Sequence, residues 1–211
     1  MSPTPFSFRR DAIVNRASGA MFLALFLGGC SLPEAQSDPT RYYLLAMPAA
    51  ETSSAPNASA PVVHLRPVEL ASYLRSRPLI VRRGENEVDF RDYARWGEPL
   101  EQGIARMLGE ELLARGAASE VATAGAHAPT RPADFELAVR VLACEGRAHG
   151  GVDFRATWEL AAATDKHAVV AHGDFHPADL KWDGRNEATL AAAISRAVDG
   201  LSAEIAGGLK R

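Results

Sequence analysis

Apolar residues alternate with polar ones over two long segments in the second half of the chain, and this pattern predicts strands. The alternation runs over 135–141 and again over 152–160, on either side of a glycine turn at 150–151. A period of two places successive side chains on opposite faces of a half-buried strand. A polar turn at 164–167 then precedes a third predicted strand over 168–176. Three consecutive strands joined by short turns predict an antiparallel meander.

The first half of the chain contains shorter apolar segments, which also favour strands. Strands are predicted over 41–47 and 62–70, followed by a turn or short helix over 71–74. A hairpin is predicted over 79–90, because two apolar runs there flank a polar Gly-Glu-Asn turn. A further short strand is expected near Val121.

Two segments have the helical period instead. The first predicted helix begins near Gly97, with Pro99 suited to its first position, and ends at Gly116. The second is capped by Asn186 and frays near 207–208. Their apolar stripes are formed by Leu100, Ile104, Met107, Leu108 and Leu112 in the first helix and by Leu190, Ile194, Val198, Leu201, Ile205 and Leu209 in the second. One-sided helices and a one-sided sheet bury their apolar faces most simply against each other. We therefore expect the α+β class, as a two-layer sandwich with a mainly antiparallel sheet and two long helices packed on one face.

The first thirty residues have the three-part order of a secretory signal. Basic residues Arg9, Arg10 and Arg16 precede an uncharged, mostly apolar run over 17–29, and Cys30 follows it. The run is shorter than the roughly 20 residues that a membrane-spanning helix needs. We therefore predict that residues 1–29 are a signal peptide that is removed.

The residues before the predicted cleavage point resemble the lipobox of bacterial lipoproteins, with the sequence Leu27-Gly28-Gly29-Cys30. The resemblance implies that the Cys30 thiol carries a covalent lipid with acyl chains such as palmitate. Residues 30–40 would then form the lipidated N-terminus and a polar, flexible stalk, and 41–211 a single domain. Ser31 stands where an Asp would favour the inner membrane, so we expect the domain on the periplasmic face of the outer membrane. No other cofactor is expected.

Charge and cysteine content narrow the function classes. The chain has a formal net charge of −3, and loss of the predicted signal peptide, which carries +2, leaves about −5. An acidic chain lacks the basic surface that nucleic-acid binding requires, so no nucleic-acid partner is expected. Cys144 is the one cysteine besides Cys30. We therefore expect no internal disulfide and a small, buried thiol rather than a nucleophile.

Motifs for catalysis are hard to find in the sequence. It has no nucleophile elbow, phosphate-binding loop or dinucleotide fingerprint. His172, Asp174 and His176 have metal-binding side chains and would share one face of the third meander strand. The favoured interpretation is an ordinary solvent-facing side of that strand, because alternation predicts polar residues there anyway. No metal is therefore expected, and a periplasmic metal-dependent hydrolase using these three residues is kept as an alternative function.

The most specific pattern lies within residues 67–100. It comprises Pro67-Val68-Glu69-Leu70, Tyr73-Leu74, Arg77-Pro78-Leu79-Ile80-Val81-Arg82-Arg83, Asp89-Phe90 and Arg95-Trp96-Gly97-Glu98-Pro99-Leu100. This pattern resembles the ABC-type transport auxiliary lipoprotein family, the PqiC-like group named for a paraquat-inducible transport system. The signature residues, for which a structural role is expected, are Tyr73, Arg77, Pro78, Arg95, Trp96, Glu98, Pro99 and Leu100.

The resemblance implies a protein that is not an enzyme. Such proteins are auxiliary subunits of MCE-type ABC transport systems, which move lipids between the inner and outer membranes, and they act by docking. The expected partners are the membrane through the lipid anchor, a periplasmic MCE-domain protein, phospholipid, and further copies of the chain in a homo-oligomer. A structural envelope lipoprotein without a transport partner is the other alternative.

Overall fold

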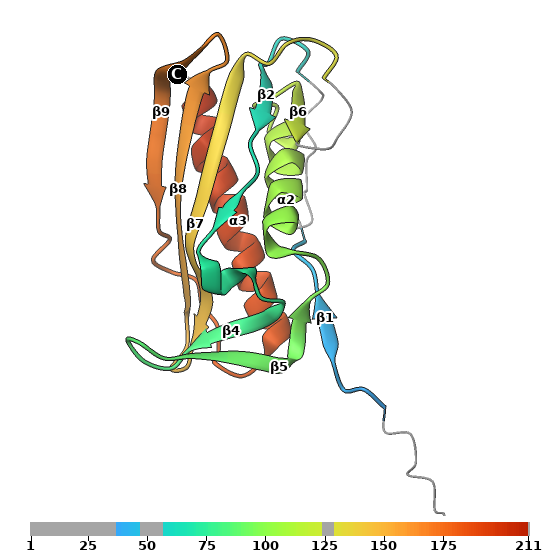
Figure 1. Cartoon of the computed structure of the whole chain (residues 1–211), viewed down its shortest axis with the longest axis vertical. Coiled ribbons are helices and arrows are strands. Elements are labelled where there is room, and N and C mark those ends of the chain that lie inside the picture. Colours follow the sequence, from blue (N-terminus) through green and yellow to red (C-terminus); the bar gives the residue numbers. More distant parts are fainter. Residues whose placement is uncertain (1–36, 47–56, 124–128, 211) are drawn as a thin grey trace, which may run out of the picture. The chain divides into compact units, whose positions relative to one another are not determined.

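A curled mixed sheet forms one layer of the domain, and two helices cover one of its faces (Figure 1). The computed structural model describes residues 37–46, 57–123 and 129–210, and residues from Pro39 onward cluster into one unit. The predicted signal peptide, Cys30 and most of the predicted stalk lie outside the described residues. No helix within these described ranges is long and apolar enough to cross a membrane.

The elements alternate along the chain much as the hydrophobic pattern predicts. In chain order they are β1 (Arg41–Tyr43), β2 (Val62–Leu65), β3 (Glu69–Leu70), the 3-10 helix η1 (Ser72–Arg75), β4 (Pro78–Arg82), β5 (Val88–Trp96), α2 (Leu100–Ala114), β6 (Glu120–Thr123), β7 (Phe135–Arg147), β8 (Val152–Ala162), β9 (Asp165–Phe175) and α3 (Glu187–Leu209). The α+β class with two helices on one face is therefore confirmed.

The expectation of a mainly antiparallel sheet is wrong. Strands β7, β8 and β9 form the expected antiparallel meander, and β4 pairs with β5 in a hairpin. The remaining pairs are parallel: β1 with β5, β2 with β6, and β2, β3 and β4 with β7. The parallel pairs of β2, β3 and β4 with β6 or β7 arise because α2 returns the chain between the partners, so that β6 and β7 run in the direction of β2.

Strand β7 organises the sheet because both of its edges are paired. Strand β8 follows one edge along nearly its whole length, while β2, β3 and β4 follow one another along the other edge. The single strand expected over 62–70 is divided into β2 and β3 around Pro67, which has no N–H to donate to the ladder. Arg66 continues the pairing just before it, since its N–H donates to the Leu137 carbonyl at 2.9 Å.

The core lies between the sheet and the two helices. The stripe residues of α2 and α3 are buried, including Ile104, Leu108 and Ile194, and they face inward residues of β7 and β8 such as Leu137 and Phe154. Asn186 caps α3 as predicted, because its side-chain oxygen accepts from the N–H groups of Ala188 and Thr189.

Candidate functional site

A buried carboxylate joins three elements near the end of β7. Glu145 is fully buried, and its Oε2 accepts a hydrogen bond of 2.6 Å from the Tyr73 hydroxyl of η1. Its Oε1 accepts one of 2.6 Å from Nε of Arg82 on β4. Tyr73 also reaches the Leu142 carbonyl at 3.3 Å. One side chain thus fixes η1 and β4 against β7, in the segment that carries the most specific sequence pattern.

The electrostatics of this group favour one ionic state. Burial and the neighbouring Glu145 raise the pKa of the Tyr73 phenol well above its usual range, so the hydroxyl remains a donor. The hydrogen bond to Glu145 also raises the pKa of Arg82. The Tyr73 hydroxyl, the Glu145 carboxyl group and the Arg82 guanidinium satisfy one another's hydrogen bonds, which is typical of a structural cluster.

The remaining signature residues surround the corner between β5 and α2. Trp96 is buried, and its backbone N–H donates to the Arg77 carbonyl at 2.7 Å. Pro78 begins β4 opposite Arg95. Pro99 is the N-cap of α2 and Leu100 its buried first residue, so Pro99 precedes the helix rather than occupying its first position.

Glu98 connects this corner to α2 and to the segment after β1. Its Oε1 lies 2.6 Å from Nη2 of Arg106, and the same Arg106 nitrogen donates to the Leu45 carbonyl at 2.8 Å. Glu98 holds the pKa of Arg106 above its usual value. The signature residues therefore gather into two groups of contacts, the Glu145 cluster and the β5–α2 corner.

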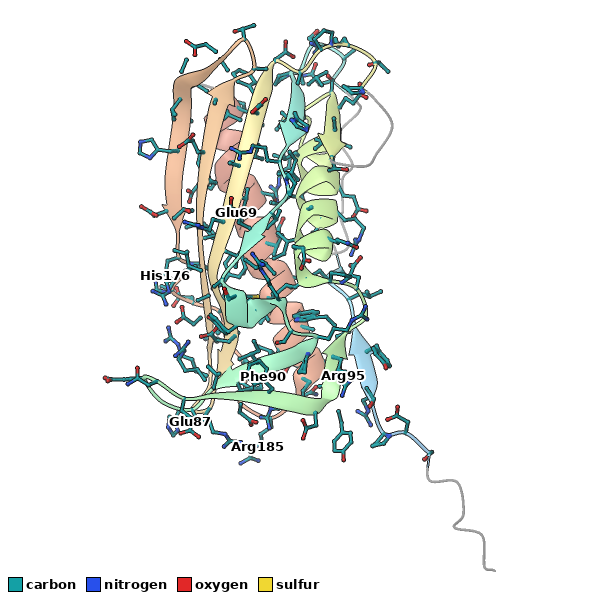
Figure 2. The ribbon with its side chains drawn as sticks, in the orientation of Figure 1. Glu69, Glu87, Phe90, Arg95, His176 and Arg185 are labelled. Carbon is teal, nitrogen blue, oxygen red and sulfur yellow. The ribbon has the colours of Figure 1, made fainter. Side chains whose placement is uncertain are left out.

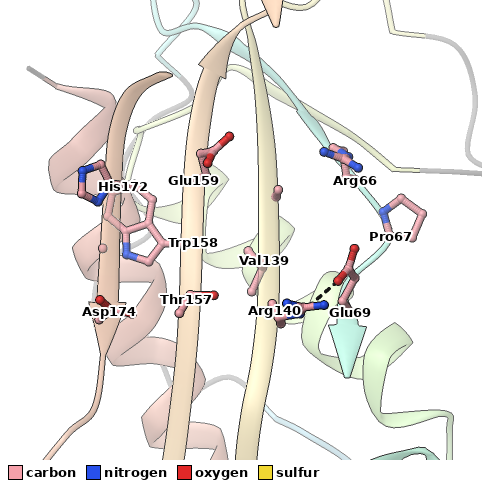
Figure 3. Close-up of a pocket in the computed structure, with 12 residues that line it drawn as sticks. Arg66, Pro67, Glu69, Val139, Arg140, Thr157, Trp158, Glu159, His172 and Asp174 are labelled. Carbon is pink, nitrogen blue, oxygen red and sulfur yellow. Dashed lines mark ion pairs between the residues drawn. The ribbon is translucent and has the colours of Figure 1, made fainter. Parts of the chain in front are cut away.

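The structure separates the three residues of the alternative metal site. His172 and Asp174 both line an open groove of about 530 Å³, which crosses the sheet face opposite the helices (Figure 3). His176 lies beyond the end of β9, and its Nε2 is 3.5 Å from Oδ1 of Asp153 on β8 (Figure 2). In the described ranges, no group of three or more His, Cys, Asp or Glu side chains is arranged to hold a metal ion.

The groove itself carries opposite charges side by side. Arg140 of β7 and Glu69 of β3 form an ion pair of 3.1 Å across its floor, and both are mostly exposed (Figure 3). Glu159 and Thr157 of β8 add further polar groups. An open, mixed-charge surface offers no enclosed, apolar site for a small molecule.

The sequence analysis did not identify two side chains that join separate elements. Glu145 was not identified because a bulge between Val141 and Ala143 interrupts the alternation of β7, so the period of two over 135–141 does not extend to it. Glu204 of α3 accepts a 2.8 Å hydrogen bond from Nε1 of Trp158, a contact between elements that no local pattern encodes. Cys144 is buried as expected, and burial raises the pKa of its thiol far above its usual value.

Solved structures share this fold at low sequence identity. Protein XCC0632 from Xanthomonas campestris aligns with a TM-score of 0.60 and 20% identity, over 80% of this chain and 93% of its own. An uncharacterized protein of known crystal structure aligns with a TM-score of 0.58 and 19% identity, over 79% and 96%. PelC from Paraburkholderia phytofirmans, crystallised as a dodecamer, aligns less well, with a TM-score of 0.43 and 15% identity over 75% and 93%.

Sequence comparison gives the family directly. No curated protein matches the chain. The family model described as the ABC-type transport auxiliary lipoprotein component matches residues 43–206, which is most of the chain and nearly all of the domain. The match includes the Glu145 cluster, the β5–α2 corner, all of α2 and most of α3. The chain therefore belongs to the family of ABC-type transport auxiliary lipoprotein components.

Proposed function

We propose that the chain is a lipid-anchored docking subunit of an MCE-type ABC transport system, held on the periplasmic face of the outer membrane. The observation that carries the proposal is the family match over 43–206 in the same chain as the lipobox ending at Cys30. A tethered domain of this family would meet the distal end of a periplasmic MCE-domain protein and assist the passage of phospholipid. Ser31 supports outer-membrane sorting.

The proposed role is non-catalytic. The buried ionisable cluster around Glu145 is satisfied internally, and the described groove on the open sheet face lacks an enclosed pocket. Both features suit a protein that acts by binding a partner at its surface rather than by catalysis. A homo-oligomer is part of the proposal, because a docking subunit for a conduit would need to surround or cap its end.

The anchor is tested by fractionating cells that produce the natural chain or its Cys30→Ala variant. We expect the natural chain in outer-membrane fractions, labelled by a palmitate analogue, and the variant without label. An unlabelled natural chain, or one recovered from the soluble periplasm, would refute the anchor.

The partner is tested by crosslinking in whole cells, followed by capture of a C-terminally tagged chain. We expect an MCE-domain protein to be enriched with the natural chain and depleted with Cys30→Ala at equal expression. Capture of further copies of the chain alone, with no MCE-domain protein, would instead support the structural-lipoprotein alternative.

The metal-dependent hydrolase has no structural support to favour it, because His176 is engaged near Asp153 rather than with His172 and Asp174. Metal analysis of the purified chain provides the decisive comparison. Stoichiometric zinc that is lost in a His172→Ala variant would overturn the docking proposal.

A further inference from the structure

The exposed aromatic residues of the described chain gather on two neighbouring strands. Tyr42 on β1 is 61% exposed, and Tyr93 and Phe90 on β5 are 62% and 39% exposed. Leu44, which follows β1, is 57% exposed. The other large apolar residues exposed within the described ranges are aliphatic and lie on α2, β7 and β9. We call Tyr42, Leu44 and Tyr93 the β1–β5 apolar edge.

The register shows how this edge is presented. Tyr42 pairs with Arg95, while the next pair, Tyr43 with Trp96, packs against the core. Because neighbours in register share a face, Tyr42 and Arg95 point away from the helices. Arg95 donates through Nε to the Asp92 carbonyl at 3.1 Å and belongs to no ion pair in the described ranges. Figure 2 places Arg95 and Phe90 at the end of the domain where β1 lies.

The length of the chain between Cys30 and β1 limits how far this end of the domain can lie from the proposed lipid. Arg41, the first residue of β1, is eleven residues after Cys30. Eleven residues span at most about 40 Å when fully extended, and less in any other conformation. The β1–β5 apolar edge is therefore the part of the sheet with the shortest covalent connection to Cys30.

We propose that the β1–β5 apolar edge rests on the phospholipid bilayer, with its aromatic side chains at the headgroup level. The proposal rests on the proposed lipid anchor and adds a second contact with the same membrane. Tyrosine suits this depth, since its ring is apolar and its hydroxyl remains hydrated. An arginine beside it reaches lipid phosphates with its guanidinium.

The two contacts reinforce each other. A tether of this length keeps the edge at a high local concentration near the bilayer, so weak interfacial contacts are enough to orient the domain. The orientation would turn the opposite end of the domain, where β6 and the turn between β8 and β9 lie, away from the membrane (Figure 1). That end would then be presented to a periplasmic partner.

The test uses the lipidated chain in vesicles of phosphatidylcholine and phosphatidylglycerol, with or without bromine on the acyl chains near the headgroup. Tyr93→Trp places an emitter on the edge, and Val170→Trp is the matched control, because Val170 is 52% exposed on β9. The three native tryptophans are buried, so the parent chain gives the baseline. We expect bromine to reduce the added emission of Tyr93→Trp and to leave Val170→Trp unchanged.

The outcomes separate this proposal from the anchor. If the chain floats with the vesicles but bromine quenches neither or both added tryptophans equally, the edge proposal is overturned and the anchor stands. A blue shift of Tyr93→Trp that grows with protein density, without quenching, would assign the edge to contact between copies and also overturn it. If the chain does not float, the anchor and the edge proposal both fall. Tyr42→Trp replaces Tyr93→Trp if that variant does not fold.

Discussion

Glu145 has no access to solvent, and its buried carboxylate is stabilised by the two side chains that donate hydrogen bonds to it. Arg82 supplies the opposite charge, and Tyr73 supplies a neutral hydrogen bond. Removing one member of a buried ion pair strands the other charge in a medium that solvates it poorly. The cluster should therefore respond very differently to loss of Arg82 and to loss of the Tyr73 hydroxyl.

We predict that Arg82→Met lowers the free energy of unfolding by about 3–5 kcal/mol, because it leaves the Glu145 carboxylate buried without its counter-charge. Tyr73→Phe should cost about 1.5–3 kcal/mol, the value of one hydrogen bond to a charged group. Urea unfolding of each variant measures the change. The double variant Arg82→Met/Glu145→Leu is the control and should recover most of the loss, since no charge remains buried. A loss below about 1 kcal/mol for Arg82→Met would contradict the prediction.

The Asp134 carboxyl makes contacts whose contribution to stability depends on pH. Its Oδ2 accepts from the Val62 N–H at 2.7 Å and lies 2.7 Å from Nη1 of Arg131. The backbone hydrogen bond lowers the pKa of the Asp134 carboxyl below its ordinary value of 3.8. A lowered folded-state pKa stabilises the fold above pH 3.8, and this contribution is lost as the pH falls further.

We predict that Asp134→Ala destabilises the chain at pH 7 by about 0.5–1 kcal/mol, a small value because the side chain is largely exposed. The difference from the natural chain should shrink as the pH falls below 3.8, because the carboxyl of the unfolded chain is protonated first and that of the folded chain at lower pH. Thermal unfolding of both proteins at pH 7 and pH 3 tests this. A difference that is constant with pH would show that packing, rather than the carboxylate charge, is what the substitution removes.

At the scale of elements, two adjacent glycines in α3 allow the effect of helix propensity on stability to be measured separately from the effect of packing. A Cβ at Gly207 would meet no heavy atom within 4 Å. A Cβ at Gly208 would lie 2.8 Å from Cη2 of Trp158 and 3.4 Å from Cβ of Ala171. Gly208 therefore permits the close approach of α3 to β8 and β9, whereas Gly207 plays no part in this packing.

We predict that Gly207→Ala stabilises the chain by up to about 1 kcal/mol, because alanine is the better helix former. Gly208→Ala should destabilise it by about 1–3 kcal/mol, because the Trp158 ring must move and strain its hydrogen bond to Glu204. The two variants are each other's control in chemical denaturation. Equal effects of the same sign would mean that α3 does not pack against Trp158 as described.

The β5–α2 corner depends on Trp96, which is 4% exposed. We predict that Trp96→Ala lowers the free energy of unfolding by about 3–5 kcal/mol, since it removes a large buried ring and leaves a cavity. Tyr93→Ala, at an exposed position of the same strand, should change stability far less. A loss below about 1 kcal/mol for Trp96→Ala would indicate that the indole is a surface contact.

The local elements could be predicted from the sequence because each has its own period. The α2 and α3 stripes, the Asn186 cap and the β7–β9 meander all follow from residues close together in the chain. The parallel pairing of β2, β3 and β4 with β7 could not, because direction depends on where the α2 crossover returns the chain. A period of two is the same for a strand paired in either direction.

At the scale of the whole molecule, the candidate site was predictable only in part. The residues of the β5–α2 corner follow from the family pattern, and the structure gives their contacts. Glu145 and the β1–β5 apolar edge depend on pairings between distant segments, such as Tyr42 with Arg95. Long-range register of this kind leaves no signal in one sequence, because each partner alone resembles an ordinary surface residue.

The arrangement of strands around β7 predicts how protection from hydrogen exchange is distributed over the domain. Strand β7 is paired along both edges, while β9 pairs with β8 alone among the strands that the structure describes, and it carries a register shift near Val169. Amides open by local unfolding most easily where one edge is unpaired and few core contacts lie beneath. We predict the slowest exchange in the β7 segment paired with β8 and faster exchange in β9, measured by mass spectrometry on the chain in detergent.

The same measurement in cell envelopes tests whether β9 is a docking edge. Slowed exchange in β9 alone would show that a partner adds a strand to that edge. Unchanged exchange would mean that the docking surface lies elsewhere on the domain. If β7 exchanged as fast as β9 in detergent, β7 would not be the central strand that the pairing describes.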